Sequence, residues 1–127
     1  MEKCLYTWVM RERPYQKLIA WKEAHSLCVW VYKITMTFPQ HEKFALADQM
    51  RRAAYSVPMN IVEGNSRRSS KDQARFLEIA ISSLEELHYQ CILANELEYL
   101  DMKILEDADD RIRRVGFLTQ KLRASIL

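Results

Sequence analysis

The amino-acid sequence predicts an all-α fold in which four helices form an antiparallel up-and-down bundle. The chain has only 2 Gly and 3 Pro among 127 residues, which leaves little of the turn chemistry that a many-stranded sheet needs. Four segments repeat apolar residues at the three-four spacing of an amphipathic helix, and short turns join them. We assign residues 1–16 to an N-terminal arm and residues 17–127 to a single helical domain.

The first predicted helix spans residues 18–37 and ends before Pro39. It is apolar on nearly every side, because only Lys33 is charged between Leu27 and Phe38. A bundle helix needs an apolar stripe of only about 100°, so we expect neighbours to cover this helix on more than one side. A monomer would expose an unusually large apolar surface. We therefore predict a homo-oligomer whose interface includes Trp21, Trp30, Tyr32 and Met36.

The second predicted helix spans residues 43–63 and contains Pro58. Proline inside a helix removes one hydrogen bond and costs roughly 3 kcal/mol, so we predict a bend there. Asn60 and Glu63 lie one turn apart beside this proline, and we expect one of them to form a hydrogen bond across the bundle. We favour this structural role over a catalytic one. The left-handed conformation that closes a helix is expected at one of two residues, Gly64 or Asn65.

The third and fourth helices are predicted over residues 70–99 and 103–124. Ser70 and Gln73 have the spacing of a capping box at the start of the third helix. In the fourth helix, acidic residues precede basic ones, which suits the helix dipole. Gly116 lies inside this helix at a cost of about 1 kcal/mol relative to Ala, and we interpret it as a point of close helix approach.

Charge distribution indicates more about function than the formal net charge of +2. Cations bracket the second helix, anions dominate from Glu85 to Asp110, and the segment from Arg111 onward carries only cations. Arginine suits contacts with phosphate groups. The candidate nucleic-acid-binding residues form two groups, Arg51, Arg52, Arg67, Arg68, Lys71 and Arg75, and then Arg111, Arg113, Arg114, Lys121 and Arg123. Their expected role is phosphate neutralisation, because no aromatic-rich groove argues for base reading.

Enzyme and metal chemistry find little support in the sequence. Glu85 and His88 form one Glu-x-x-His pair, but a di-iron bundle needs two such pairs and further glutamates, and no second pair exists. No glycine-rich phosphate loop is present. We expect no catalytic residues, no metal site and no cofactor.

The cysteine pattern and hydropathy favour a cytoplasmic location. The three cysteines show no Cys-x-x-Cys spacing, which fits a reducing compartment better than a disulfide framework. The first residues lack the apolar stretch of a signal peptide. No run approaches the ~18 apolar residues of a membrane helix, so we expect no membrane partner.

Several segments together resemble one known family. These are LIAWKEAHSL with YKITMTFP, then FALADQMRRAAYSVPMNIVEGNSR, then FLEIAISSLEEL and LEYL. They are similar to the four-helix-bundle proteins encoded in intervening sequences of bacterial 23S ribosomal RNA genes, a family that includes the accessory variability proteins (Avd) of diversity-generating retroelements. The similarity covers about residues 15–125. Ala45 departs from the glycine of the usual F-G-L run, and Tyr55 is bulkier than the common residue.

The resemblance implies a four-helix bundle that commonly assembles as a homopentameric ring, with a basic surface proposed to bind nucleic acid. For the retroelement members it also implies a reverse transcriptase as partner. It does not decide between the two genetic settings. The sequence is therefore interpreted as a non-enzymatic, oligomeric bundle that binds structured RNA or DNA. The rival interpretation is an assembly module without nucleic-acid binding, whose basic residues pair with the acidic residues of neighbouring subunits.

Overall fold

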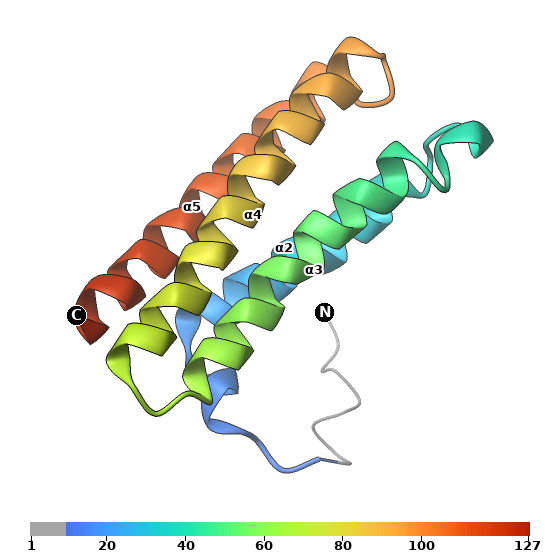
Figure 1. Ribbon diagram of the computed structural model, residues 1–127. Helices are drawn as coiled ribbons and strands as arrows, with labels where there is room; N and C mark the ends of the chain where they lie inside the picture. Colours follow the sequence, from blue (N-terminus) through green and yellow to red (C-terminus); the bar gives the residue numbers. More distant parts are fainter. Residues whose placement is uncertain (1–9) are drawn as a thin grey trace.

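The computed structural model of the chain describes residues 10–127, and within that range it is all-helical, with no strand (Figure 1). The part of the predicted arm that precedes residue 10 lies outside the described residues. Two 3-10 helices accompany four long α-helices. In chain order the elements are η1 (Pro14–Lys17), α2 (Ile19–Thr35), η2 (Gln40–Glu42), α3 (Leu46–Asn65), α4 (Ser70–Glu96) and α5 (Met102–Ile126).

The four helices pack in a closed circuit around one core. α3 contacts both α2 and α4, and α5 contacts both α4 and α2. The expectation that neighbours cover the first helix on more than one side is therefore confirmed. Each long helix contributes fully buried side chains to the core, among them Leu27, Met50, Leu87 and Val115. η1 also packs on α2 and α3, so residues 14–16, which we had placed in the arm, lie against the bundle.

The starts of two helices differ in detail from the prediction, and in each a side-chain oxygen accepts a backbone N–H of the first turn. α3 begins at Leu46 rather than at residue 43, because Glu42 Oε1 accepts the Leu46 N–H at 3.1 Å. α4 begins with Ser69 as its N-cap, whose hydroxyl accepts the Asp72 N–H at 3.1 Å. The predicted Ser70–Gln73 capping box is therefore wrong by one residue, and the Gln73 side chain donates to the Arg67 carbonyl instead.

α4 ends at Glu96 and not at residue 99. Glu98 adopts φ 66°, the only positive φ of a non-glycine residue in the described range. A left-handed residue closes a helix, and glutamate there carries a steric cost that glycine would not. The Asn95 side chain donates to the Leu100 carbonyl at 2.9 Å, which holds the turn together before α5 begins.

The polar residues beside Pro58 do not bond across the bundle as we predicted. The Asn60 side chain donates to the carbonyl and hydroxyl oxygens of Ser56, one turn earlier on the same helix. Glu63 is exposed and forms an ion pair with Arg67. The bond between helices comes from Ser56, whose hydroxyl lies 2.8 Å from that of Ser83 on α4. Pro58 itself is buried within α3, and the bend we predicted at that position stays a prediction.

Gly64 has a role that the sequence analysis missed. Neither Gly64 nor Asn65 has a positive φ, so the expected left-handed closure of α3 at one of these residues is wrong. A Cβ at this position would lie 3.2 Å from both the Gln73 carbonyl oxygen and the Phe76 Cβ. The missing side chain therefore lets α3 approach the first turns of α4 closely.

Gly116 does not mark a close helix approach, which corrects our interpretation. The nearest atom to a Cβ built there is a methyl of Leu84 at 3.9 Å, an ordinary van der Waals distance. The residue lines a groove between α4 and α5 instead. No helix in the described range is long and apolar enough to span a membrane.

Candidate nucleic-acid interface

The α3–α4 turn, η1 and the C-terminal end of α5 lie at the same end of the bundle (Figure 1). Two cavities confirm this arrangement through their lining residues. One brings Arg13, the N-cap of η1, together with Asn65 and Ser66 at the end of α3. The other brings Gly64 together with Leu122 of α5. The η2 segment and the α4–α5 turn lie at the opposite end.

The charges segregate between these two ends. We define the basic end as residues 10–23, 63–80 and 114–127, which contain eleven Lys or Arg and five Asp or Glu. We define the acidic end as residues 33–52 and 85–111, which contain six Lys or Arg and eleven Asp or Glu. Although the net charge is small, the charges are distributed unevenly, with an excess of positive charge at the end that contains the α3–α4 turn.

The α3–α4 turn presents both paired and unpaired cations. Arg67 forms an ion pair with Glu63, and its guanidinium lies 4.8 Å from the centre of the Phe76 ring. Arg75 approaches the same ring at 5.7 Å. Within residues 10–127, Arg68 and Lys71 form neither an ion pair nor a side-chain hydrogen bond, and both are exposed. These two side chains are consequently available to an external anion.

Two cations in the second half of α5 are held by acids on neighbouring helices. Arg114 forms an ion pair with Glu23 of α2, at 3.1 Å between Nε and Oε1. Arg123 donates through Nε and Nη2 to Glu78 of α4. Lys121 has no carboxylate partner in the described residues and lies 6.0 Å from the centre of the Phe117 ring. Lys121 is thus the α5 cation that adds an uncompensated charge to the basic end.

Other candidate cations lie at the acidic end and do not join this cluster. Arg51 donates through Nε to the Thr35 hydroxyl at 2.9 Å and covers the Tyr32 ring. Arg52 pairs with Asp48. Arg111 pairs with Asp107 on its own helix, and its guanidinium lies 4.6 Å from the centre of the Trp30 ring. The two groups proposed from sequence are therefore divided by the fold, and each contributes only part of its members to the basic end.

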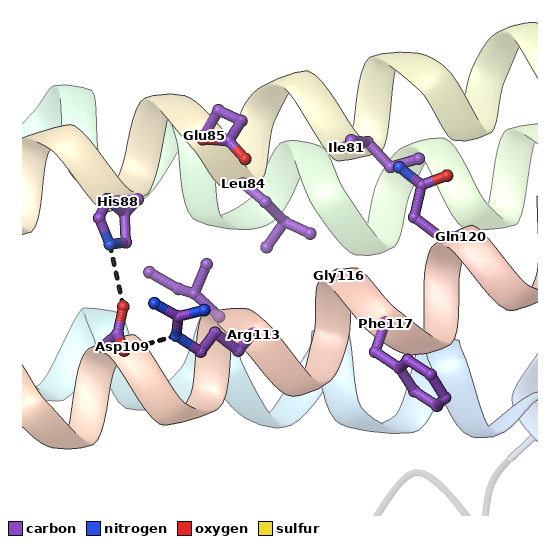
Figure 2. Close-up of a pocket in the computed structure, with 10 residues that line it drawn as sticks. Ile81, Leu84, Glu85, His88, Asp109, Arg113, Gly116, Phe117 and Gln120 are labelled. Carbon is purple, nitrogen blue, oxygen red and sulfur yellow. Dashed lines mark hydrogen bonds and ion pairs between the residues drawn. The ribbon is translucent and has the colours of Figure 1, made fainter.

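Figure 2 shows how Arg113 is held in a groove between α4 and α5. Asp109 lies between two partners, with Oδ2 2.7 Å from Arg113 Nε and Oδ1 3.0 Å from His88 Nε2. Hydrogen bonding to Arg113 first, and to His88 second, lowers the pKa of Asp109. His88 is thus part of a link between helices. Within residues 10–127, no three His, Cys, Asp or Glu side chains are grouped to hold a metal ion.

The predicted oligomer-interface residues lie on two sides of α2. Tyr32 faces α3, where Arg51 covers its ring, and Trp30 faces α5, where Arg111 covers its ring. Trp21 stacks on His25 with ring centres 5.0 Å apart. Met36 is 74% exposed. Only Tyr32 and Met36 are therefore exposed, both on the side of α2 that adjoins α3. The sequence could not distinguish them from Trp21 and Trp30, which are partly buried.

The described cysteines are unsuited to nucleophilic chemistry. Burial raises the pKa of the Cys91 thiol to about 12 and also raises the pKa of Cys28. Thiolate is the reactive form of cysteine, so both side chains remain protonated thiols at neutral pH. Cys91 is part of the hydrophobic core.

Comparisons with known proteins identify a matching family model and a solved structure of similar fold. The family model described as 23S rRNA-intervening sequence protein matches residues 16–121. A similar solved structure is the crystal structure of a protein with unknown function from the S23 ribosomal protein family of Bacteroides thetaiotaomicron. The two share 20% sequence identity and a TM-score of 0.78, over 84% of this chain and 96% of that one. This likeness shows the fold. A search of curated proteins found no match.

Proposed function

The chain belongs to the 23S rRNA-intervening sequence protein family, and we propose that it binds RNA or DNA, without catalysis, through its basic end. The observation that carries this proposal is the convergence of η1, the α3–α4 turn and the end of α5 into one positively charged surface. Exposed cations there, including Arg68, Lys71 and Lys121, lack an acidic partner among the described residues. Such side chains can neutralise phosphates without losing an internal contact.

A self-associated form would strengthen this binding by repeating the basic end. We propose that the α2–α3 face forms the contact between copies. Near one end of this face, the guanidinium of Arg51 on α3 covers the Tyr32 ring on α2. Near the other end, His25 of α2 and Val62 of α3 line the same cavity. Between these points, exposed apolar side chains lie on both helices, namely Val29, Tyr32, Tyr55 and Met59, with Met36 beyond them.

The number of copies in this proposal follows the family resemblance, which implies a pentameric ring. Within each copy, we propose that consecutive helices run antiparallel in up-and-down order. Short connections at residues 66–69 and 97–101 support that order. A ring would place every basic end on one face, so the excess positive charge of a single chain would be repeated around it.

The test compares two triple variants that remove the same net charge. Arg68→Gln, Lys71→Gln and Arg75→Gln act at the basic end, and Lys33→Gln, Lys43→Gln and Lys103→Gln act at the acidic end. All six residues are exposed. Binding of a structured RNA hairpin and a DNA duplex is measured from low to high salt. The basic-end variant should flatten the dependence of log affinity on log salt by about 0.9 per lost duplex contact, and the acidic-end variant should resemble the parent.

Equal weakening by both triple variants would show that only net charge matters and would exclude the basic end as a site. Absence of binding by the parent at low salt would favour the second candidate, an assembly module.

The exposed apolar α2–α3 face supports the assembly-module candidate. Six of the eleven candidate cations already pair with acids of their own chain, namely Arg52, Arg67, Arg111, Arg113, Arg114 and Arg123. This internal pairing argues against an assembly held mainly by ion pairs between subunits.

A further inference from the structure

A cavity of about 740 Å³ opens at the basic end, between the segment around η1, the start of α2 and the end of α3. The sequence contains no signal of an aromatic-rich groove, but the fold brings together three rings from separate positions in the chain. Tyr15, Trp21 and His25 all line this cavity. None of them is fully buried, so part of each ring remains accessible.

The rings form an ordered cluster. Trp21 and His25 are stacked, with ring centres 5.0 Å apart and planes at 6°. Tyr15 meets Trp21 edge-on, with ring centres 5.1 Å apart and planes at 73°. The edge-on contact anchors η1 to α2. Proteins that bind single-stranded nucleic acid use flat aromatic surfaces of this kind as platforms on which bases stack.

Two arginines and an amide complete the lining of the cavity. Arg11 and Arg13 are exposed, and in the described part of the chain neither forms an ion pair. Asn65 lines the same cavity and is exposed, and a carboxamide offers both hydrogen-bond donors and an acceptor. The cavity therefore combines a stacking surface, unpaired positive charge and a polar group able to contact a base edge.

We propose that this cavity accepts one unpaired base of RNA or DNA, with the adjacent phosphates against Arg11 and Arg13. This inference rests on the proposed function and makes it more specific, because it predicts a preference for looped or frayed strands over continuous duplex. Phosphates along the α3–α4 turn would contribute to binding of either form. The cavity would contribute only when a base is free to leave its stack.

The experiment uses the full-length chain and two ligands of equal length, a hairpin with 2-aminopurine in its loop and a fully paired duplex. Each is made as RNA and as DNA. Stacking quenches 2-aminopurine, so its fluorescence should fall when the parent binds the hairpin. The variant Tyr15→Leu with His25→Leu should lose at least about fivefold in affinity for the hairpin and retain its affinity for the duplex. Tyr89→Leu, which removes an exposed ring from α4, is the matched control and should change neither.

A second variant preserves the test should the double leucine variant fold poorly. Arg11→Gln with Arg13→Gln changes only exposed side chains and should also reduce the preference for the hairpin. If the parent binds both ligands equally and the loop fluorescence does not change, the cavity proposal is wrong while the basic-end proposal stands. If the parent binds neither ligand, both proposals are wrong.

Discussion

The Tyr99 hydroxyl donates a hydrogen bond to Glu42 Oε2 at 2.8 Å, joining the segment before α3 to the turn before α5. The other carboxylate oxygen, Oε1, accepts the Leu46 N–H at the start of α3. The hydrogen bond from Tyr99, followed by that from Leu46, lowers the pKa of Glu42. The same bond to Glu42 raises the pKa of Tyr99. One carboxylate therefore caps a helix and links the two connections at the acidic end.

This relationship predicts a pH-dependent effect of Tyr99→Phe. Because the pKa of Glu42 is lowered in the folded state, its ionised form contributes stability at pH values above the ordinary glutamate pKa of 4.5, and that contribution is lost as the pH falls through the lowered pKa. The variant should therefore be less stable than the parent at pH 7, and the difference should shrink below about pH 4. Denaturant unfolding at pH 7, 5 and 3 measures this. Tyr89→Phe, at an exposed ring on α4, is the control. A constant difference across the pH range would contradict the prediction.

The two glycines should respond in opposite ways to alanine. Helix propensity favours alanine over glycine by about 1 kcal/mol, and at Gly116 the new methyl meets nothing closer than 3.9 Å. Gly116→Ala should therefore raise the free energy of unfolding. At Gly64 the methyl would lie 3.2 Å from a backbone oxygen and a Cβ of α4, atoms that move only if the helix moves. Gly64→Ala should destabilise the protein. Thermal unfolding of both variants decides the matter, and stabilisation by Gly64→Ala would disprove the close approach.

The serine pair between α3 and α4 should matter more than the neighbouring ion pair. Ser83 is buried, and its hydroxyl lies 2.8 Å from that of Ser56. Ser83→Ala removes this partner and should cost about 1 kcal/mol. Glu63→Ala removes an exposed pair with Arg67 one turn away and should stay within about 0.5 kcal/mol of the parent. Equilibrium unfolding in urea compares them, and a larger loss for Glu63→Ala would reverse our assignment.

The described thiols should differ in accessibility to reagents. Cys91 lies in the core with a pKa of about 12, and Cys28 is only partly buried, with a pKa raised by burial. In the variant Cys4→Ser, which leaves these two thiols, Ellman's reagent at pH 8 should modify Cys28 slowly and Cys91 only after unfolding. Rapid modification of both thiols in the folded protein would contradict the packing of α4.

Self-association through the α2–α3 face predicts different effects for two equally exposed methionines. Met59 on α3 is 57% exposed and lies on the proposed face, whereas Met102 is 58% exposed at the start of α5. Met59→Glu should shift the protein toward smaller species, because a charge buried without a partner disfavours the contact. Met102→Glu should leave the assembly unchanged. Light scattering after size exclusion measures both, and a monomeric parent at micromolar concentration would disprove this contact.

The sequence by itself determined the secondary structure and the family. Apolar spacing was sufficient to place four helices to within a few residues, because burial of one face requires that period whatever the neighbours are. Scarcity of glycine and proline excluded a sheet for the same local reason. The segment around Pro58 carried the family resemblance, which the family match over residues 16–121 confirmed.

Tertiary structure decided which of these residues meet. The sequence grouped Arg51 with Arg67 because they are close along the chain, but Arg51 lies near the start of α3 and Arg67 just after its end, and this helix spans the bundle. The two side chains therefore lie at opposite ends. Tyr15, Trp21 and His25 gave no signal in sequence, since their cluster depends on how η1 folds back onto α2. Gly64 was assigned to a turn, whereas its missing Cβ serves the contact with α4. Local spacing fixes what each residue does within its own helix, and contacts between helices depend on packing geometry that no single segment encodes.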